Sequence, residues 1–150
     1  MTGTYGVTVV STDNNKKPNM RSFIIITVLS ALVACYSASV LPSEEEMITV
    51  IYDENFPNGT IVSKEELDSR FTRSGLVSSW VCTVPAISRQ SQVITLQYLG
   101  DSRDLVRRVV HSYTGSPTMT HSPLITNNMF VTITSRTGQE INSRVELYLY

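Results

Sequence analysis

The sequence has little of several residue types that small proteins use for chemistry. It holds two cysteines, two histidines and one tryptophan in 150 residues. A metal site needs three or four converging ligands, and His111, His121 and a distant carboxylate supply too few. A phosphate-binding glycine loop is also missing, because Gly100 and Gly115 stand far from any strand-to-helix junction. We therefore expect no metal and no cofactor.

A surplus of positive charge is missing as well. Residues 1–37 hold three of the 12 basic residues and one of the 13 acidic residues, so residues 38–150 carry a net charge of about −3. Nucleic-acid-binding domains normally carry clustered basic charge. This composition disfavours direct nucleic-acid binding.

The sequence lacks a hydrophobic run long enough to span a bilayer as a helix, which takes roughly 20 residues. Its longest apolar stretch is Phe23 to Ala34, which follows Lys16, Lys17 and Arg21. A basic flank, a short apolar run and small residues after it are typical of a secretory signal peptide. We expect cleavage near Ser37, an extracellular product and no membrane segment in the mature form.

Several alternatives remain at this end of the chain. Residues 1–19 are polar and show no folding pattern, so Met20 is a candidate start that makes residues 20–37 the signal peptide. A long segment that starts at Met1 is the other interpretation. An uncleaved signal anchor is a third.

The number of cysteines depends on that cleavage. Cys35 lies in the leader and Cys82 lies in an apolar run, so residues 38–150 contain one cysteine and no disulfide framework. We expect Cys82 to be a small buried hydrophobic residue. The alternative is a disulfide between two chains.

Residues 38–150 are predicted to form one all-β domain, a sandwich or a partly closed barrel. The strand-like runs are rich in β-branched and aromatic residues and are separated by Gly, Pro and Asn. Seven are expected, at 47–52, 60–63, 76–84, 92–99, 105–113, 129–135 and 143–150. Thr114 to Pro123 is predicted as a mobile loop. In the last strand Val145, Leu147 and Leu149 share one face.

The first two strands are expected to pair as a hairpin, because Asn58-Gly59 is a strong turn signal. Asn58-Gly59-Thr60 is also a glycosylation sequon. After a signal peptide and on a turn, Asn58 is a candidate glycosylation site.

The segment from Ser63 to Phe71 has residues typical of a short helix. Ser63 is a suitable cap, and Glu65 and Glu66 suit the start of a helix whose Leu67 and Phe71 pack inward. A polar loop is the alternative for these residues.

Catalytic constellations are weak. His111, Ser112 and Asp101 or Asp104 have the residue types of a catalytic triad, but no nucleophile elbow accompanies them. The mixed charges from Asp101 to Arg108 are predicted to form a solvated surface.

Four aromatic residues allow two interpretations. Trp80, Tyr98, Tyr113 and Tyr148 either fill the core or form a binding surface for a protein or a small apolar ligand.

The second half of the chain holds the runs at 93–96 and 131–142, the pair Gly100-Asp101 and the closing Val145-Glu146-Leu147-Tyr148. Together these features resemble the insect multiprotein bridging factor type 2 family over about residues 76–150. In place of the glycine pair usual in that family before the penultimate strand, this chain has Gly115 followed by Ser116-Pro117, and the family's amino-terminal glycine and acidic pattern is not evident. The resemblance implies transcriptional coactivation by bridging proteins, or a small secreted protein.

The predicted leader favours the small secreted protein. We therefore expect a secreted, non-enzymatic binding protein of an arthropod body fluid or secretion. An intracellular transcription coactivator that bridges proteins is the alternative, and a small hydrolase is the third.

Overall fold

A computed structural model describes residues 5–10, 21–28, 34–36, 47–70 and 75–149 of the chain. The described elements are β1 (Tyr5–Val10), β2 (Arg21–Val28), β3 (Ala34–Tyr36), β4 (Ile48–Tyr52), β5 (Thr60–Val62), α1 (Lys64–Arg70), β6 (Leu76–Val84), β7 (Val93–Leu99), β8 (Arg108–Tyr113), β9 (Thr118–His121), β10 (Asn128–Thr134) and β11 (Ile141–Tyr148). The prediction of an all-β protein is confirmed.

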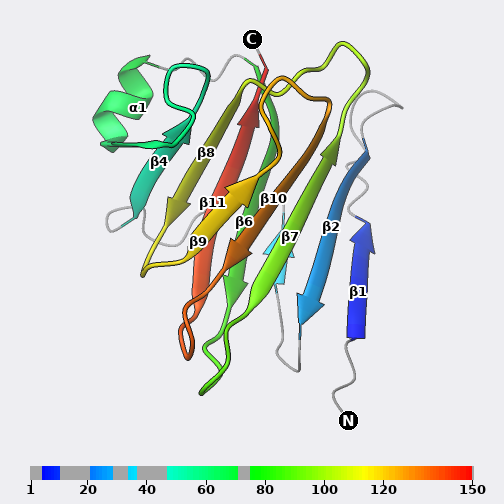
Figure 1. Cartoon of the computed structure of the whole chain (residues 1–150), viewed down its shortest axis with the longest axis vertical. Helices are drawn as coiled ribbons and strands as arrows, with labels where there is room; N and C mark the ends of the chain where they lie inside the picture. Colours follow the sequence, from blue (N-terminus) through cyan, green and yellow to red (C-terminus); the bar gives the residue numbers. More distant parts are fainter. Residues whose placement is uncertain (1–4, 11–20, 29–33, 37–46, 71–74, 150) are drawn as a thin grey trace.

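The described strands form two antiparallel sheets. The five-stranded sheet has the order β1-β2-β7-β10-β9, and the six-stranded sheet has the order β3-β6-β11-β8-β4-β5. Figure 1 shows β9, β10 and β7 crossing in front of β8, β11 and β6. The arrangement is a sandwich.

The main core lies between the two sheets and follows the period of two along each strand. In β10, Met129, Val131 and Ile133 are buried and alternate with more exposed residues. In β11, Val145 and Leu147 belong to the same core cluster, with Leu149 packed against it. The predicted shared face of these three residues is confirmed.

Helix α1 covers part of the outer face of the six-stranded sheet. Ser63 caps it, since the Glu66 N–H donates to Ser63 Oγ at 3.2 Å and the Leu67 N–H donates to the Ser63 carbonyl at 2.9 Å. Leu67 packs against a second cluster of buried residues, which includes Ile51 and Tyr148. The predicted helix and its cap are confirmed, while the predicted contact of Phe71 lies outside the described residues.

The polar stretch from Thr114 to Pro123 is not a continuous loop. Residues Thr118–His121 form β9, which pairs with β10. The prediction of a mobile loop is therefore wrong for these four residues. Their Thr-Met-Thr-His pattern alternates half-buried Met119 and His121 with exposed threonines. This period-two alternation suits a strand at the edge of a sheet, although the residues are mostly polar.

The first part of the chain also contains strands. β1 lies in the segment that the sequence predicts to be without a folding pattern, and β2 includes part of the predicted leader. β2 pairs with β7 from Arg21↔Leu99 to Thr27↔Val93. The predicted start at Met20 and cleavage near Ser37 lie outside the described residues, and the signal peptide stays a prediction.

Cys82 differs from its expected state. It is buried, as predicted, but it is disulfide-bonded and not a free thiol. The register of β3 and β6 places Cys35, the other cysteine of the chain, opposite Cys82. The expectation of a lone cysteine fails because the strand around Cys35 pairs with β6.

Candidate binding surface

Most of the four predicted surface aromatics are core residues. Trp80 is 3% exposed, Tyr98 is fully buried and Tyr148 is 8% exposed, while Tyr113 is half-buried. Trp80 and Tyr98 lie in the core between the sheets, and Tyr148 lies in the cluster under α1. They fill the interior, which was the other interpretation, and do not gather on one surface.

Tyr98 illustrates how fully these rings are enclosed. Burial, with the nearby charges of Asp104 and then Asp101, raises the pKa of the Tyr98 hydroxyl to about 12. Gly100 lies over this ring, and a Cβ atom there would come within 2.6 Å of the Tyr98 oxygen. Tyr98 therefore supports the turn after β7, and its ring offers no accessible face to a ligand.

The predicted triad residues do not assemble. His111 is 1% exposed, and its Nε2 lies 3.1 Å from Ser143 Oγ. Ser112 points to the opposite face of β8, where its hydroxyl lies 2.8 Å from Thr49 Oγ1. Burial lowers the pKa of His111 to about 4, so the ring is neutral at pH 7. The His111 pair is a buried polar contact between β8 and β11.

His121 lies elsewhere, on β9. Its Nδ1 is 2.6 Å from the Ser122 carbonyl, and its ring meets the edge of Tyr52 with centroids 5.0 Å apart. Among the described residues, histidine, cysteine and acidic side chains form no group of three that suits a metal ion.

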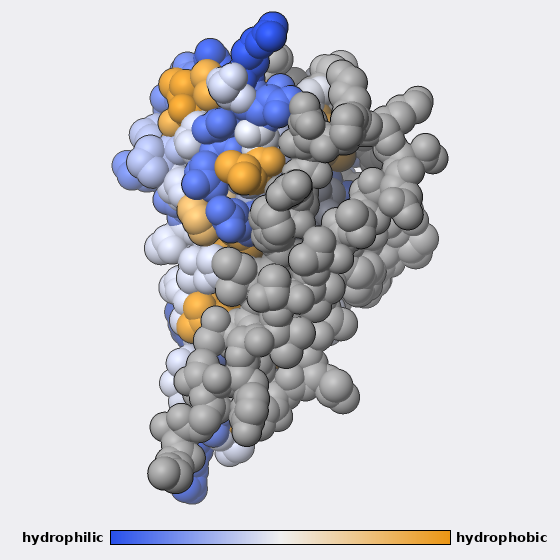
Figure 2. Space-filling view, turned by 90° about the vertical axis from the view of Figure 1, so that its right-hand side faces the viewer, coloured by the Kyte–Doolittle hydropathy of each residue, from blue (hydrophilic) through white to orange (hydrophobic). Residues whose placement is uncertain are grey.

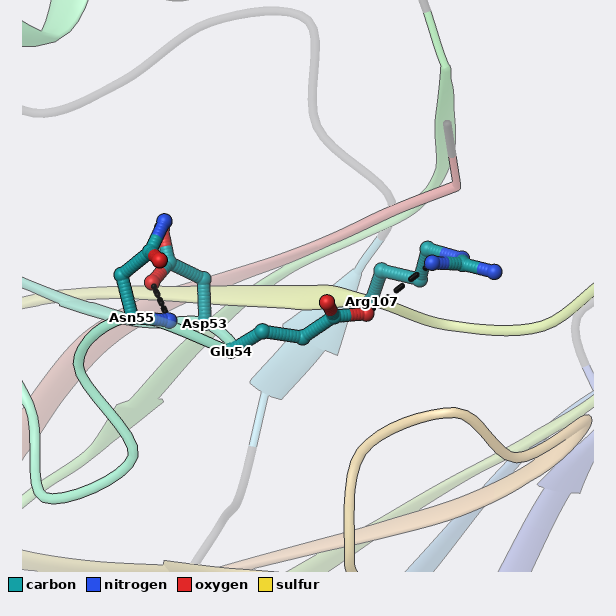
Figure 3. A network of polar contacts seen from close by, with 4 residues as sticks. All are labelled: Asp53, Glu54, Asn55 and Arg107. Carbon is teal, nitrogen blue, oxygen red and sulfur yellow. Dashed lines mark hydrogen bonds and ion pairs between the residues drawn. The ribbon is translucent and has the colours of Figure 1, made fainter.

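Part of the mixed-charge segment forms ion pairs at the end of β4. Arg107 Nη1 lies 2.9 Å from Glu54 Oε1, and Arg108 Nε lies 3.8 Å from Asp53 Oδ2. Figure 3 shows Glu54 directed at Arg107 beside the turn of Asp53 and Asn55. The Arg107 pair is exposed, as the solvated interpretation predicts, whereas the Arg108 pair is largely buried. These charges hold the β4–β5 connection against β8.

That connection contains two hydrogen-bonded turns. Asp53 Oδ1 accepts from the N–H groups of Asn55 at 2.9 Å and of Phe56 at 3.0 Å. The Gly59 N–H then donates to the Phe56 carbonyl at 3.0 Å. Asn58, the predicted glycosylation site, lies exposed in this second turn.

The inner face of the six-stranded sheet has an exposed apolar region at its β4–β5 end. Ile61 is 71% exposed and Ile48 is 43% exposed. The register pairs Val50 with Ile61 and Ile48 with Tyr113, so these side chains lie on the face that carries the core in β8 and β11. Val50, which lies between them, is buried at 8% exposure. We call exposed Ile48 and Ile61, with buried Val50 between them, the apolar shelf.

The shelf is exposed because the two sheets end at different places. Tyr52 of β4 contacts His121 of β9, which is the last described strand of the five-stranded sheet on this side. Beyond β4, the six-stranded sheet continues with β5, its last described strand, whereas the five-stranded sheet ends at β9 among the described strands. β9 and β5 each pair with one described strand, so each leaves an edge beside the shelf.

Other exposed hydrophobic residues are more scattered. On the outer face of the five-stranded sheet, Val93, Leu99 and Phe130 are each 37–38% exposed and alternate with polar neighbours such as Gln97 and Thr132. Figure 2, seen from the β1 side, shows hydrophobic groups separated by hydrophilic ones over its coloured part. This pattern is common on soluble β-sheets.

Sequence reasoning did not find the shelf. Ile48, Val50 and Ile61 lie in runs that predict half-buried strands, and the sequence does not say which strand of the opposite sheet would cover them. The feature that could have pointed to the shelf is Ile61, an apolar residue in a three-residue strand next to a turn.

Comparison with known proteins found no relative of the chain. No family model, curated protein or solved structure matches the chain. In the part of the chain that the structure describes, no helix has the length and apolar character needed to cross a membrane.

Proposed function

We propose that the protein is a secreted, non-enzymatic binding protein that engages a partner through the apolar shelf. The observation that carries the proposal is Ile61, which projects from the inner face of a sheet and leaves 71% of its surface in water. Exposed apolar surface beside strand edges is typical of interaction sites. The leader-like run from Phe23 to Ala34 supports an extracellular location.

The partner best suited to this place is a protein that offers an extended apolar segment. Such a segment pairs with the edge of β9 through main-chain hydrogen bonds and places alternate side chains on the shelf. β9 holds no Asp, Glu, Lys or Arg, and the shelf residues are uncharged. An apolar strand therefore meets no desolvation penalty for buried charge.

The resemblance to the multiprotein bridging factor type 2 family agrees with a binding role. The coactivation associated with that family depends on contact with other proteins, and the leader favours the small secreted form for this chain. The proposal does not involve catalysis, because His111 is enclosed between the sheets and its partner Ser143 is fully buried.

Location is tested by expressing the full chain in insect cells and measuring the mass of the product in medium and lysate. We expect the protein in the medium, shortened by the leader. Accumulation in the nucleus with residues 23–34 intact would contradict secretion and support the bridging alternative.

Binding is tested with a displayed library of random linear peptides selected on the full-length protein. We expect selected peptides to alternate apolar residues and to lose at least about tenfold in affinity against Ile61→Lys, since a buried apolar anchor contributes 1.4 kcal/mol or more. Phe130→Lys is the matched control, because it places the same charge at a partly exposed position on the other sheet. Equal loss in both variants, or the selection of no binding peptide, would overturn the proposed partner.

A further inference from the structure

The sequon lies in a turn whose shape is tightly specified. Gly59 has φ = 84°, a conformation that side-chain-bearing residues rarely adopt. A Cβ atom at Gly59 would lie 2.7 Å from Tyr52 Cε1 and 2.8 Å from Val50 Cγ1. The turn therefore requires glycine as the middle residue of Asn58-Gly59-Thr60, and it holds Asn58 in one place on the surface.

An exposed aromatic ring begins the same turn. Phe56 is 44% exposed, and its carbonyl accepts the hydrogen bond from Gly59 that closes the turn. The Cα atoms at the two ends of such a turn are within about 7 Å of each other. A sugar attached to Asn58, two residues after Phe56, is thus within reach of the ring.

We propose that Asn58 is N-glycosylated and that the first N-acetylglucosamine packs on the face of Phe56. One face of this sugar presents C–H groups, and an aromatic face is electron-rich, so the two surfaces are complementary. Packing removes part of the Phe56 ring from water and adds a contact within the turn. The inference rests on the proposed secretion, because the modifying enzyme acts in the secretory compartment.

The chemistry of attachment is a simple transfer. The donor is a lipid diphosphate that carries the oligosaccharide. A bond forms between Asn58 Nδ2 and the anomeric carbon of the first sugar, and the bond from that carbon to the lipid diphosphate breaks. The amide nitrogen loses one proton, and the lipid diphosphate leaves.

The position of this turn gives the glycan a second consequence. Ile61 comes directly after the sequon and is part of the shelf, whereas Phe56 lies in the connection before β5. A sugar packed on Phe56 therefore covers an exposed aromatic residue of the hairpin that is not part of the shelf.

The full chain is expressed in insect cells, and the experiment compares the thermal stability of three forms of the secreted product. With an α-mannosidase inhibitor in the culture, the glycan stays in a form that an endoglycosidase trims to one N-acetylglucosamine. The trimmed protein is compared with the untrimmed protein and with Asn58→Gln. Each comparison is made in the wild-type, Phe56→Ala and Phe130→Ala backgrounds.

We expect the trimmed wild-type protein to keep the Tm of the untrimmed one and Asn58→Gln to melt about 3 °C lower. The same difference is expected with Phe130→Ala, in which the removed ring is 38% exposed on the other sheet. With Phe56→Ala the difference should vanish. If Phe56→Ala does not fold, Phe56→Leu serves instead, and it should lose most of the difference.

Two results would overturn the inference: an unmodified Asn58 in secreted protein, or a Tm difference that persists without the Phe56 ring. An unmodified protein that stays in the cells would contradict the proposed secretion as well, so the two failures are distinguishable. The intact mass of the product, measured before melting, separates them.

Discussion

His111 shows how the fold changes the chemistry of one side chain. The residue is 1% exposed, and burial without a compensating negative charge lowers its pKa from 6.5 to about 4. The contact with Ser143 satisfies one ring nitrogen, and the ring of Tyr113 lies 4.7 Å away, centroid to centroid. In the folded protein the residue therefore acts as a polar core residue.

This pKa predicts a dependence of stability on pH. Between pH 6.5 and 4 the unfolded chain binds a proton at His111 that the folded chain does not bind, so stability rises with pH across this window. We expect the contribution to be fully present above pH 6.5 and to fall by roughly 3 kcal/mol as the pH drops to 4. Urea unfolding at several pH values measures it.

The matched control for this prediction is His111→Gln, which keeps a polar side chain without a titrating ring. Its stability should decline less steeply between pH 6.5 and 4 than that of the wild-type protein. Parallel curves for the two proteins would show that other groups, such as carboxylates, cause the whole decline.

At the scale of the element, α1 depends on what it covers more than on its own sequence. It has seven residues, fewer than an isolated helix needs in water, and its Glu65 and Glu66 lie in the first turn. Leu67 docks it on the cluster that contains Val62 and Val110. The helix is stable because it closes the outer face of β4, β5 and β8.

The cap of α1 gives a prediction at this scale. Ser63→Ala removes the acceptor of the Glu66 N–H, and we expect a loss of about 1 kcal/mol in the free energy of unfolding. Ser69→Ala is the control, since the Ser69 hydroxyl donates to the Glu66 carbonyl within the same helix but caps nothing. Chemical denaturation measures both variants. Equal effects would show that the cap has no special contribution.

At the scale of the whole molecule, the disulfide and the predicted cleavage exclude each other, because the cleavage removes Cys35. Cys82 is disulfide-bonded, and Cys35 lies opposite it on β3. Cleavage after Ser37 would remove Cys35 along with β1 and β2. β7 would then lose the pairing with β2 and become an edge strand of its sheet.

Thiol counting decides between these two states. We expect the intact chain, folded under oxidising conditions and denatured without a reductant, to have no thiol that iodoacetamide alkylates. A product that begins after Ser37 should have one, at Cys82, unless it dimerises through that residue. Mass spectrometry of the alkylated protein measures the number. Two alkylated cysteines in the intact oxidised chain would contradict the bond.

The sequence by itself determined the class of the fold, because period-two alternation and turn residues act over a few neighbouring positions. The face shared by Val145 and Leu147, the Asn58-Gly59 turn and the Ser63 cap were all predictable from such local patterns. The edge strand β9 was missed because its threonines and flanking prolines resemble a loop when its partner β10 is not known.

The tertiary structure alone decided which faces are covered. Burial of Trp80 and Tyr98, the exposure of Ile61 and the pairing of β3 with β6 depend on strands far apart in the chain. A strand of alternating residues has the same sequence pattern whether its inner face meets another sheet or water. The apolar shelf therefore exists because the five-stranded sheet ends at β9, opposite β4, and no local signal encodes that ending.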